Sequence, residues 1–192
     1  MDSIRAFIAL PLPESASHQL GQFLISLKAK APHGFRLVNI ENIHLTLAFL
    51  GNTPLNKIEQ LTKMLEELIK NHAAMPAHFS TLGAFPSANR MRIFWLGIET
   101  NHELIALQKE IAHCCKLCNL PTDDKPFIPH LTLARLSDEM NQSERMQSAE
   151  LLKTSLKGLQ EAFILDKLVI FKSTLKPAGA VYSPVHEFLL KI

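Results

Sequence analysis

The sequence carries little net charge: 20 Lys and Arg residues stand against 18 Asp and Glu residues, which gives a formal charge of +2 at pH 7. A protein that grips a long nucleic-acid duplex neutralises many phosphates with clustered basic residues. The charge balance argues against such a role, whereas a small or single-stranded anionic ligand is compatible with it.

Long apolar runs are also scarce. The first residues, MDSIRAFIALPLPE, contain an acid at position 2 and an apolar run limited to residues 6–10. This run is too short for the hydrophobic region of a signal peptide, and a membrane span needs roughly 20 residues. We therefore expect a soluble, cytoplasmic protein.

Cysteines are few, and all three lie in the segment HCCKLC, as Cys114, Cys115 and Cys118. Thiolates beside an imidazole can bind zinc, but no second cysteine pair with matching spacing is present. The segment continues a helical pattern of apolar residues, and cysteine packs readily as a small apolar side chain. We expect the three thiols to pack in the core, and their odd number argues against a disulfide framework.

The 192 residues, 47% of them hydrophobic, suffice for one domain made of two similar lobes with a substantial core. Apolar periodicity predicts helices over 14–30, 54–71, 102–118 and 143–157, the second of them capped by Thr53 and opened by Pro54. Strand patterns occupy 4–10, the two repeated segments described next, 77–85, 92–98, 163–171 and 180–190. No linker or low-complexity tract interrupts the chain, so we expect a single α+β domain spanning residues 1–192.

One heptad occurs twice. Residues 44–50 read HLTLAFL and residues 130–136 read HLTLARL, so six of the seven positions are identical. Side chains alternate between the two faces of a strand, so in each copy the His and the Thr share one face and the leucines share the other. An old duplication kept only for packing would explain the leucines. It would not explain two polar side chains on each strand.

The four polar side chains of the repeat suit acid-base chemistry on a phosphodiester. Of two imidazoles that face one cleft, one can act as a base while the other, protonated, acts as an acid. The hydroxyls of Thr46 and Thr132 can donate hydrogen bonds to an anionic group held between His44 and His130. The catalytic candidates are therefore His44, His130, Thr46 and Thr132.

Motifs that bind catalytic metal ions are absent. Neither copy of the heptad contains an acidic residue, and the sequence has no D-x-D, no H-E-x-x-H and no glycine-rich phosphate loop. A two-metal phosphatase needs carboxylates to hold its ions. We therefore expect no metal and no cofactor.

These features resemble the two-histidine (2H) phosphoesterases and, within them, the LigT-like RNA 2',3'-cyclic phosphodiesterases. The resemblance extends over nearly the whole chain, through RAFIALPLPE, ENIHLTLAFLG, GAFPSANRMRIFWLG, KPFIPHLTLAR and VYSPV. It implies a bilobal α+β fold in which two antiparallel sheets, related by a pseudo-twofold axis, flank a central cleft with helices on the outer faces. It also implies hydrolysis of the cyclic phosphate at an RNA or nucleotide end to a 2'-phosphomonoester. In that reaction His44 would be the proton donor, His130 the proton acceptor, and Thr46 and Thr132 the residues that hold the phosphoryl oxygens.

Five other residues are candidates for substrate contacts, and the sequence allows two interpretations of each. The resemblance implies that Arg135 contacts phosphate or lines the cleft. Strict alternation puts it on the leucine face instead, and only a bulge or the end of the strand would bring it to the other face. Phe7 and Phe49 could stack on a base, although their apolar strand context favours packing in the core. Arg90 and Arg92 could equally contact an RNA backbone or lie in a solvated loop.

Three positions depart from the family pattern: Leu37, where a Trp is frequent, and Lys125 and Ile128, where arginines are common. These changes affect the affinity and length of the substrate rather than the chemistry. Two alternatives stay open. The first is a related enzyme, either a 2'-5' RNA ligase or phosphodiesterase or an enzyme that acts on a small cyclic nucleotide. The second is a non-catalytic module that binds RNA ends. We expect a monomer whose partners are RNA ends or nucleotide 2',3'-cyclic phosphates, with no membrane partner.

Overall fold

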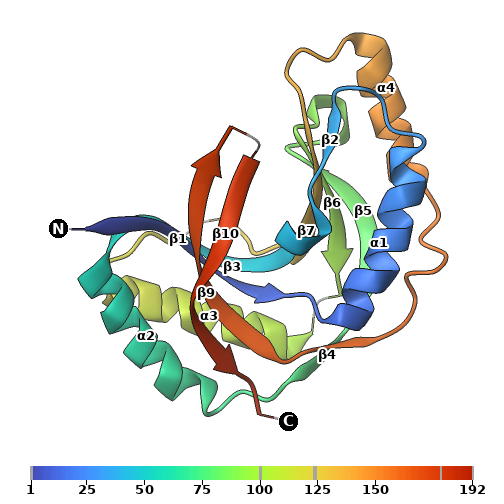
Figure 1. The fold of residues 1–192 in the computed structure, drawn as a ribbon. Helices are drawn as coiled ribbons and strands as arrows, with labels where there is room; N and C mark the ends of the chain where they lie inside the picture. Colours follow the sequence, from blue (N-terminus) through green and yellow to red (C-terminus); the bar gives the residue numbers. More distant parts are fainter. Residues whose placement is uncertain (1, 100, 123–124, 178, 192) are drawn as a thin grey trace.

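The computed structural model describes residues 2–99, 101–122, 125–177 and 179–191. Within these ranges it has the predicted α+β architecture, with four α-helices packed outside a large antiparallel sheet (Figure 1). The helices are α1 (Glu14–Lys28), α2 (Leu55–Ile69), α3 (His102–Leu117) and α4 (Gln142–Glu150). The strands are β1 (Ser3–Pro11), β2 (Phe35–Leu37), β3 (His44–Pro54), β4 (Met75–Ala77), β5 (Phe79–Phe85), β6 (Ile93–Ile98), β7 (His130–Leu136), β8 (Phe163–Leu165), β9 (Lys167–Lys176) and β10 (Gly179–Leu189).

The large sheet has two halves that meet at the repeated heptads. Its strand order is β10-β9-β1-β3-β7-β6-β5, β2 pairs with β7, and β4 and β8 form a separate two-stranded sheet. The strands β3 and β7 share one register pair, Leu45 with Leu131. The two expected lobes are thus the two halves of one sheet, joined at this pair. Helices α2 and α3 lie together under the first half, and α1 and α4 lie on the outside of the second (Figure 1).

Bulges interrupt both repeated strands at the same place. Consecutive residues Ile8 and Ala9 of β1 pair with Ala48 and Thr46, so Leu47 is an extra residue in β3. Consecutive residues of β6 pair with Ala134 and Thr132, so Leu133 is the extra residue in β7. A bulge bends the strand and resets the alternation of its side chains. The faces predicted from the heptad therefore hold only as far as its fourth residue.

The core confirms the inward face of the repeat. Leu45, Leu47, Leu131 and Leu133 are buried in one hydrophobic cluster that also contains helix residues. The three cysteine thiols lie in this cluster too, as predicted. Burial raises the pKa of all three thiols, and that of Cys115 to about 12, which makes them poor nucleophiles at neutral pH.

Several predicted boundaries are wrong. Thr53 does not cap α2: it is a buried residue of β3 whose hydroxyl donates to the carbonyl of Leu50, and α2 begins after Pro54 without a side-chain cap. The helix expected over 143–157 ends as α4 at Glu150 and continues as a 3-10 turn. The strand expected over 163–171 is split into β8 and β9. In the described part of the chain, no helix is both long and apolar enough to cross a membrane.

Candidate active site

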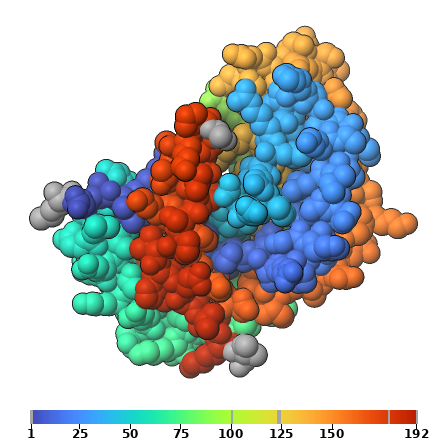
Figure 2. Space-filling view, in the orientation of Figure 1, coloured from blue at the N-terminus to red at the C-terminus, as the bar shows by residue number. Residues whose placement is uncertain are grey.

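A cleft of about 710 Å³ lies between the hairpin of β9 and β10 and the segment that runs from β2 into β3. Figure 2 shows the surface hollowed between the red hairpin and the light-blue residues that precede β3. His44, Thr46 and Thr132 line this cleft. His130 lines an adjoining apolar pocket of about 640 Å³, which shares Thr46 and Phe49 with the cleft. The two sites therefore meet at the repeated strands, and they contain all four catalytic candidates.

The pair Leu45–Leu131 organises these four side chains. In an antiparallel pair, residues one step away on each strand come opposite each other with their side chains on the other face of the sheet. This register sets His44 across from Thr132, and Thr46 across from His130. The two imidazoles are also close enough for the charge on His130 to lower the pKa of His44. The structure thus brings together the residues that the repeat singled out.

Each imidazole is held by the carbonyl two residues before it. The Nδ1 atom of His44 lies 2.8 Å from the Asn42 oxygen, and that of His130 lies 2.7 Å from the Ile128 oxygen. Because a carbonyl only accepts, Nδ1 carries the hydrogen in this geometry, and the lone pair of a neutral imidazole is at Nε2. Each histidine therefore presents Nε2 as the atom that can take or give a proton.

Aromatic side chains pack against both imidazoles. The ring of Phe7 stacks on His44 with centroids 4.7 Å apart, and Tyr182 meets His44 edge-on at 5.3 Å. His130 is met edge-on by Phe85 at 4.9 Å and lies 5.9 Å from Trp95. These contacts limit the rotation of the rings that the backbone carbonyls align. Sequence reasoning missed Tyr182, because its role depends on the β9–β10 hairpin adding to the sheet next to β1.

The protein environment favours the neutral form of both histidines. Burial lowers the pKa of His44 to about 4, with further lowering by the charges of His130 and Arg135 against the opposing hydrogen bond to Asn42. Burial also lowers the pKa of His130. Both imidazoles are thus neutral at pH 7 in the free protein, and an acid among them must gain its proton as an anionic ligand binds.

This environment predicts an acid-shifted pH profile for kcat/KM, which reports the free enzyme. The form with one proton on the histidine pair is lost as pH rises through the lowered pKa values, so we expect a maximum below pH 6.5, the ordinary histidine value. The alkaline limb of kcat should lie at higher pH, because a bound phosphate anion stabilises the imidazolium. Initial rates from pH 4 to 9 measure both profiles, and a kcat/KM that stays level up to pH 8 would contradict the expectation.

The bulges decide where Arg135 and Phe49 lie. Because Leu133 is an extra residue, Arg135 turns from the leucine face to line the cleft, as the resemblance implied and strict alternation did not. Phe49 occupies the same heptad position after the Leu47 bulge and is 66% exposed, so the expectation that it packs in the core is wrong. Phe7 is buried, with 4% exposed, but it packs under His44 rather than among the core leucines.

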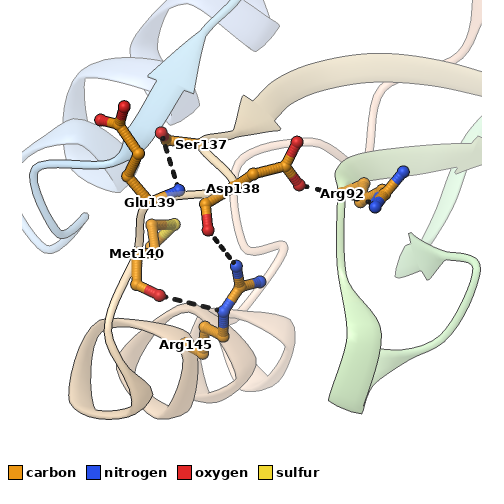
Figure 3. A network of polar contacts seen from close by, with 6 residues as sticks. All are labelled: Arg92, Ser137, Asp138, Glu139, Met140 and Arg145. Carbon is orange, nitrogen blue, oxygen red and sulfur yellow. Dashed lines mark hydrogen bonds and ion pairs between the residues drawn. The ribbon is translucent and has the colours of Figure 1, made fainter.

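Arg92 and Arg90 lie outside the cleft. Arg92 borders the apolar pocket, and its Nε is 3.7 Å from a carboxylate oxygen of Asp138 (Figure 3). Arg145 of α4 donates to the carbonyls of Asp138 and Met140, which ties the loop after β7 to this helix. Arg90 lines neither the cleft nor the pocket.

The remaining cleft residues come from several elements, among them β1, β2, the segment between β2 and β3, and the start of β10. Arg5, Arg36 and Asn42 line it, and sequence reasoning named none of them. The Asn42 amide donates to the Ala180 carbonyl over 3.3 Å, which links the two walls of the cleft. Of the positions that depart from the family pattern, Leu37 lines the cleft, and Lys125 and Ile128 line the apolar pocket.

The chain is similar in sequence and in structure to several known proteins. An RNA 2',3'-cyclic phosphodiesterase of Methanocaldococcus jannaschii is 29% identical over 186 residues, which are 96% of this chain and 100% of the relative. Another, of Aquifex aeolicus, is 32% identical over 158 residues, 80% of each chain. Escherichia coli LigT, crystallised with 3'-AMP, is 22% identical and has a TM-score of 0.79 over 98% of this chain and 99% of its own, so the fold is shared. Residues 16–176 match the family described as the 2'-5' RNA ligase superfamily, and since this match covers most of the chain, the protein belongs to that superfamily.

Proposed function

We propose that this protein is a phosphodiesterase that hydrolyses the 2',3'-cyclic phosphate at an RNA or nucleotide end to a 2'-phosphomonoester. One observation carries the proposal: the Leu45–Leu131 pair sets two aligned imidazoles and two threonine hydroxyls around the junction of the cleft and the pocket. The relatives of M. jannaschii and A. aeolicus are named for this reaction, which supports the same activity here.

In the proposed mechanism, base and acid act on opposite sides of the phosphorus atom. Water attacks in line with the bond to the 3' oxygen and gives its proton to Nε2 of His130. As that bond breaks, the 3' oxygen takes a proton from Nε2 of His44, and the phosphate remains on the 2' oxygen. The reaction therefore needs His130 neutral and His44 protonated at the start. Both Nδ1 atoms stay hydrogen-bonded to their backbone carbonyls throughout.

Threonine and arginine side chains would stabilise the charge on phosphorus-bound oxygens. Thr46 and Thr132 lie across the strand pair from His130 and His44, where their hydroxyls can donate to those oxygens. The guanidinium of Arg135 lies near enough to His44 to lower its pKa and lines the same cleft, which supports a contact with the same phosphate. The exposed ring of Phe49, between cleft and pocket, offers a face for a base.

Turnover of adenosine 2',3'-cyclic phosphate tests the proposal directly. We expect adenosine 2'-phosphate as the product, at a rate that EDTA does not change, because the proposed acid, base and hydrogen-bond donors are side chains of the protein. Chromatography against 2'- and 3'-phosphate standards identifies the product. Loss of turnover on chelation that a divalent ion restores would contradict the metal-free mechanism, and a 3'-phosphate product would contradict the assignment of the leaving oxygen.

The same site could in principle act on a 2'-5' linkage or only bind RNA ends. A 5' hydroxyl in place of the attacking water would form a 2'-5' bond, and a binding module would capture cyclic phosphate without turnover. The names of the relatives favour hydrolysis over both alternatives. A single domain over residues 1–192, a monomeric state and a cytoplasmic location stay predictions of the sequence.

A further inference from the structure

Three arginines line the cleft, and no acidic residue balances them. Arg5, Arg36 and Arg135 all border it, and its described lining contains no Asp or Glu. Within the part of the chain that the structure describes, none of the three makes an ion pair. The cleft is thus a concentrated positive region on a protein whose net charge is only +2.

Two of these arginines face each other across a strand pair. Arg36 of β2 is the register partner of Arg135 of β7, and both side chains are exposed. Like charges directly opposite each other in a sheet are destabilising. Such a pair is favourable when anionic ligand groups lie against it, because arginine binds phosphate oxygens through two parallel hydrogen bonds.

One phosphate does not account for both guanidiniums. The cyclic phosphate carries one negative charge, and the proposed mechanism already surrounds it with Thr46, Thr132, Arg135 and the imidazolium of His44. Arg36 lies on β2, which pairs with the same edge of β7 as β3 does. The charges that lower the pKa of His44 are those of His130 and Arg135 and not that of Arg36, so the Arg36 guanidinium lies further from this imidazole. The guanidinium of Arg36 is therefore available for a second anionic group of the same substrate.

The direction of the reaction indicates which group that is. The leaving 3' oxygen stays on the ribose and receives its proton from His44, so the nucleoside lies on the His44 side of the phosphorus atom. His44 lines the arginine-rich cleft, whereas His130, on the side of the attacking water, lines the apolar pocket. The 5' carbon of that ribose, with any phosphate on it, falls within the cleft that Arg36 borders.

We propose that Arg36 binds a second phosphate group, on the 5' carbon of the nucleotide whose cyclic phosphate is opened. The inference rests on the proposed function. The second phosphate can be the phosphodiester that joins this nucleotide to an RNA strand or the terminal phosphate of a free nucleotide. The proposal makes Arg36 a specificity-determining residue that favours substrates with two phosphates over a mononucleoside cyclic phosphate.

The test compares three substrates: adenosine 2',3'-cyclic phosphate, its 5'-phosphorylated form, and the dinucleotide ApA ending in a 2',3'-cyclic phosphate. We expect kcat/KM to be about tenfold or more higher for a substrate with the second phosphate, the scale of a hydrogen bond to a charged group. In Arg36→Gln, kcat/KM should be nearly the same with and without the second phosphate. The matched control, Arg90→Gln, removes the same charge outside both sites and should keep the difference between the substrates.

Binding of product analogues gives a readout independent of turnover. Calorimetry should show that the wild-type protein prefers adenosine 2',5'-bisphosphate over adenosine 2'-phosphate and that Arg36→Gln loses this preference. The affinity for the bisphosphate should depend less steeply on salt concentration in the variant, because one attraction between a guanidinium and a phosphate is lost. Its melting temperature should equal or exceed that of the wild type, because the opposed charges are relieved.

The outcomes separate this inference from the proposed function. If kcat/KM is higher for both substrates with a second phosphate, and this difference disappears in Arg36→Gln, Arg36 binds any 5' phosphate. If kcat/KM is higher for the ApA substrate alone, and this difference disappears in the variant, the ligand is the phosphodiester of the strand. Equal kcat/KM for all three substrates, or a gain that survives in Arg36→Gln, overturns the role of Arg36 while the phosphodiesterase activity stands. Failure of the wild type to turn over any of the three would contradict the proposed function itself.

Discussion

Replacing either His44 or His130 by alanine is expected to lower kcat about 10²- to 10⁴-fold, the usual contribution of a general acid or base. Each imidazole presents Nε2 because its Nδ1 is held by a backbone carbonyl, and no other described histidine lines either site. Single-turnover kinetics on adenosine 2',3'-cyclic phosphate measures the effect. His18→Ala, at an exposed position on α1, is the matched control and should retain wild-type kcat.

The double variant distinguishes a concerted pair from two independent contributions. If acid and base act in one step, losing the second histidine costs little more once the first is gone, since residues that act as a unit are not additive. We expect the double variant to fall within about tenfold of the worse single variant. Losses that multiply, or single variants that remain nearly as active as the wild type, would contradict the paired mechanism.

The second large effect is expected at the threonines. Thr46→Val and Thr132→Val keep the shape of the side chain but remove the donor to the developing charge on phosphate, a change worth on the order of 10²-fold in kcat. The measurement is kcat at saturating substrate, alongside a thermal melt that should show a nearly unchanged fold. Thr81→Val, on an exposed position of β5, is the control. Unchanged kcat in both site variants would mean that the hydroxyls only pack.

The heptad shows which side-chain orientations can be predicted from the sequence and which cannot. Strand alternation correctly separates His44 and Thr46 from Leu45 and Leu47, because the first four residues of the repeat follow regular pleating. It fails at the sixth position, where the bulge at the fourth residue reverses the face of the side chain. The bulge depends on the register with a neighbouring strand, and a single strand's sequence carries no signal of it.

Long-range contacts account for the other omissions. The three-residue strand β2 is too short to show a period, so Arg36 had no predicted place until β2 was paired with β7. Tyr182 reaches His44 only because β10 and β9 add to the sheet beside β1. The burial of Cys115 and Cys118 could be predicted, because both lie in a helical pattern of apolar residues that is visible in a single segment of sequence. Both are buried in the structure.

The acid-shifted histidines add a constraint that the sequence could not supply. A histidine pair in water would titrate near 6.5, whereas burial among aromatic side chains lowers both pKa values and keeps both imidazoles neutral in the free protein. In the proposed mechanism, protonation of the acid is therefore coupled to binding of the phosphate anion. Replacing Phe7 or Tyr182 would alter this coupling through the solvation of His44 rather than through contact with the reacting atoms.

The most direct test of the central claim, that His44 and His130 act as acid and base on opposite sides of one phosphate, is leaving-group rescue. The substrate is a 2',3'-cyclic phosphate in which sulfur replaces the bridging 3' oxygen, because a thiolate leaves without needing a proton. The account predicts that this substrate restores much of the lost kcat in His44→Ala and none in His130→Ala. Equal rescue of both variants, or rescue of His130→Ala alone, would contradict it.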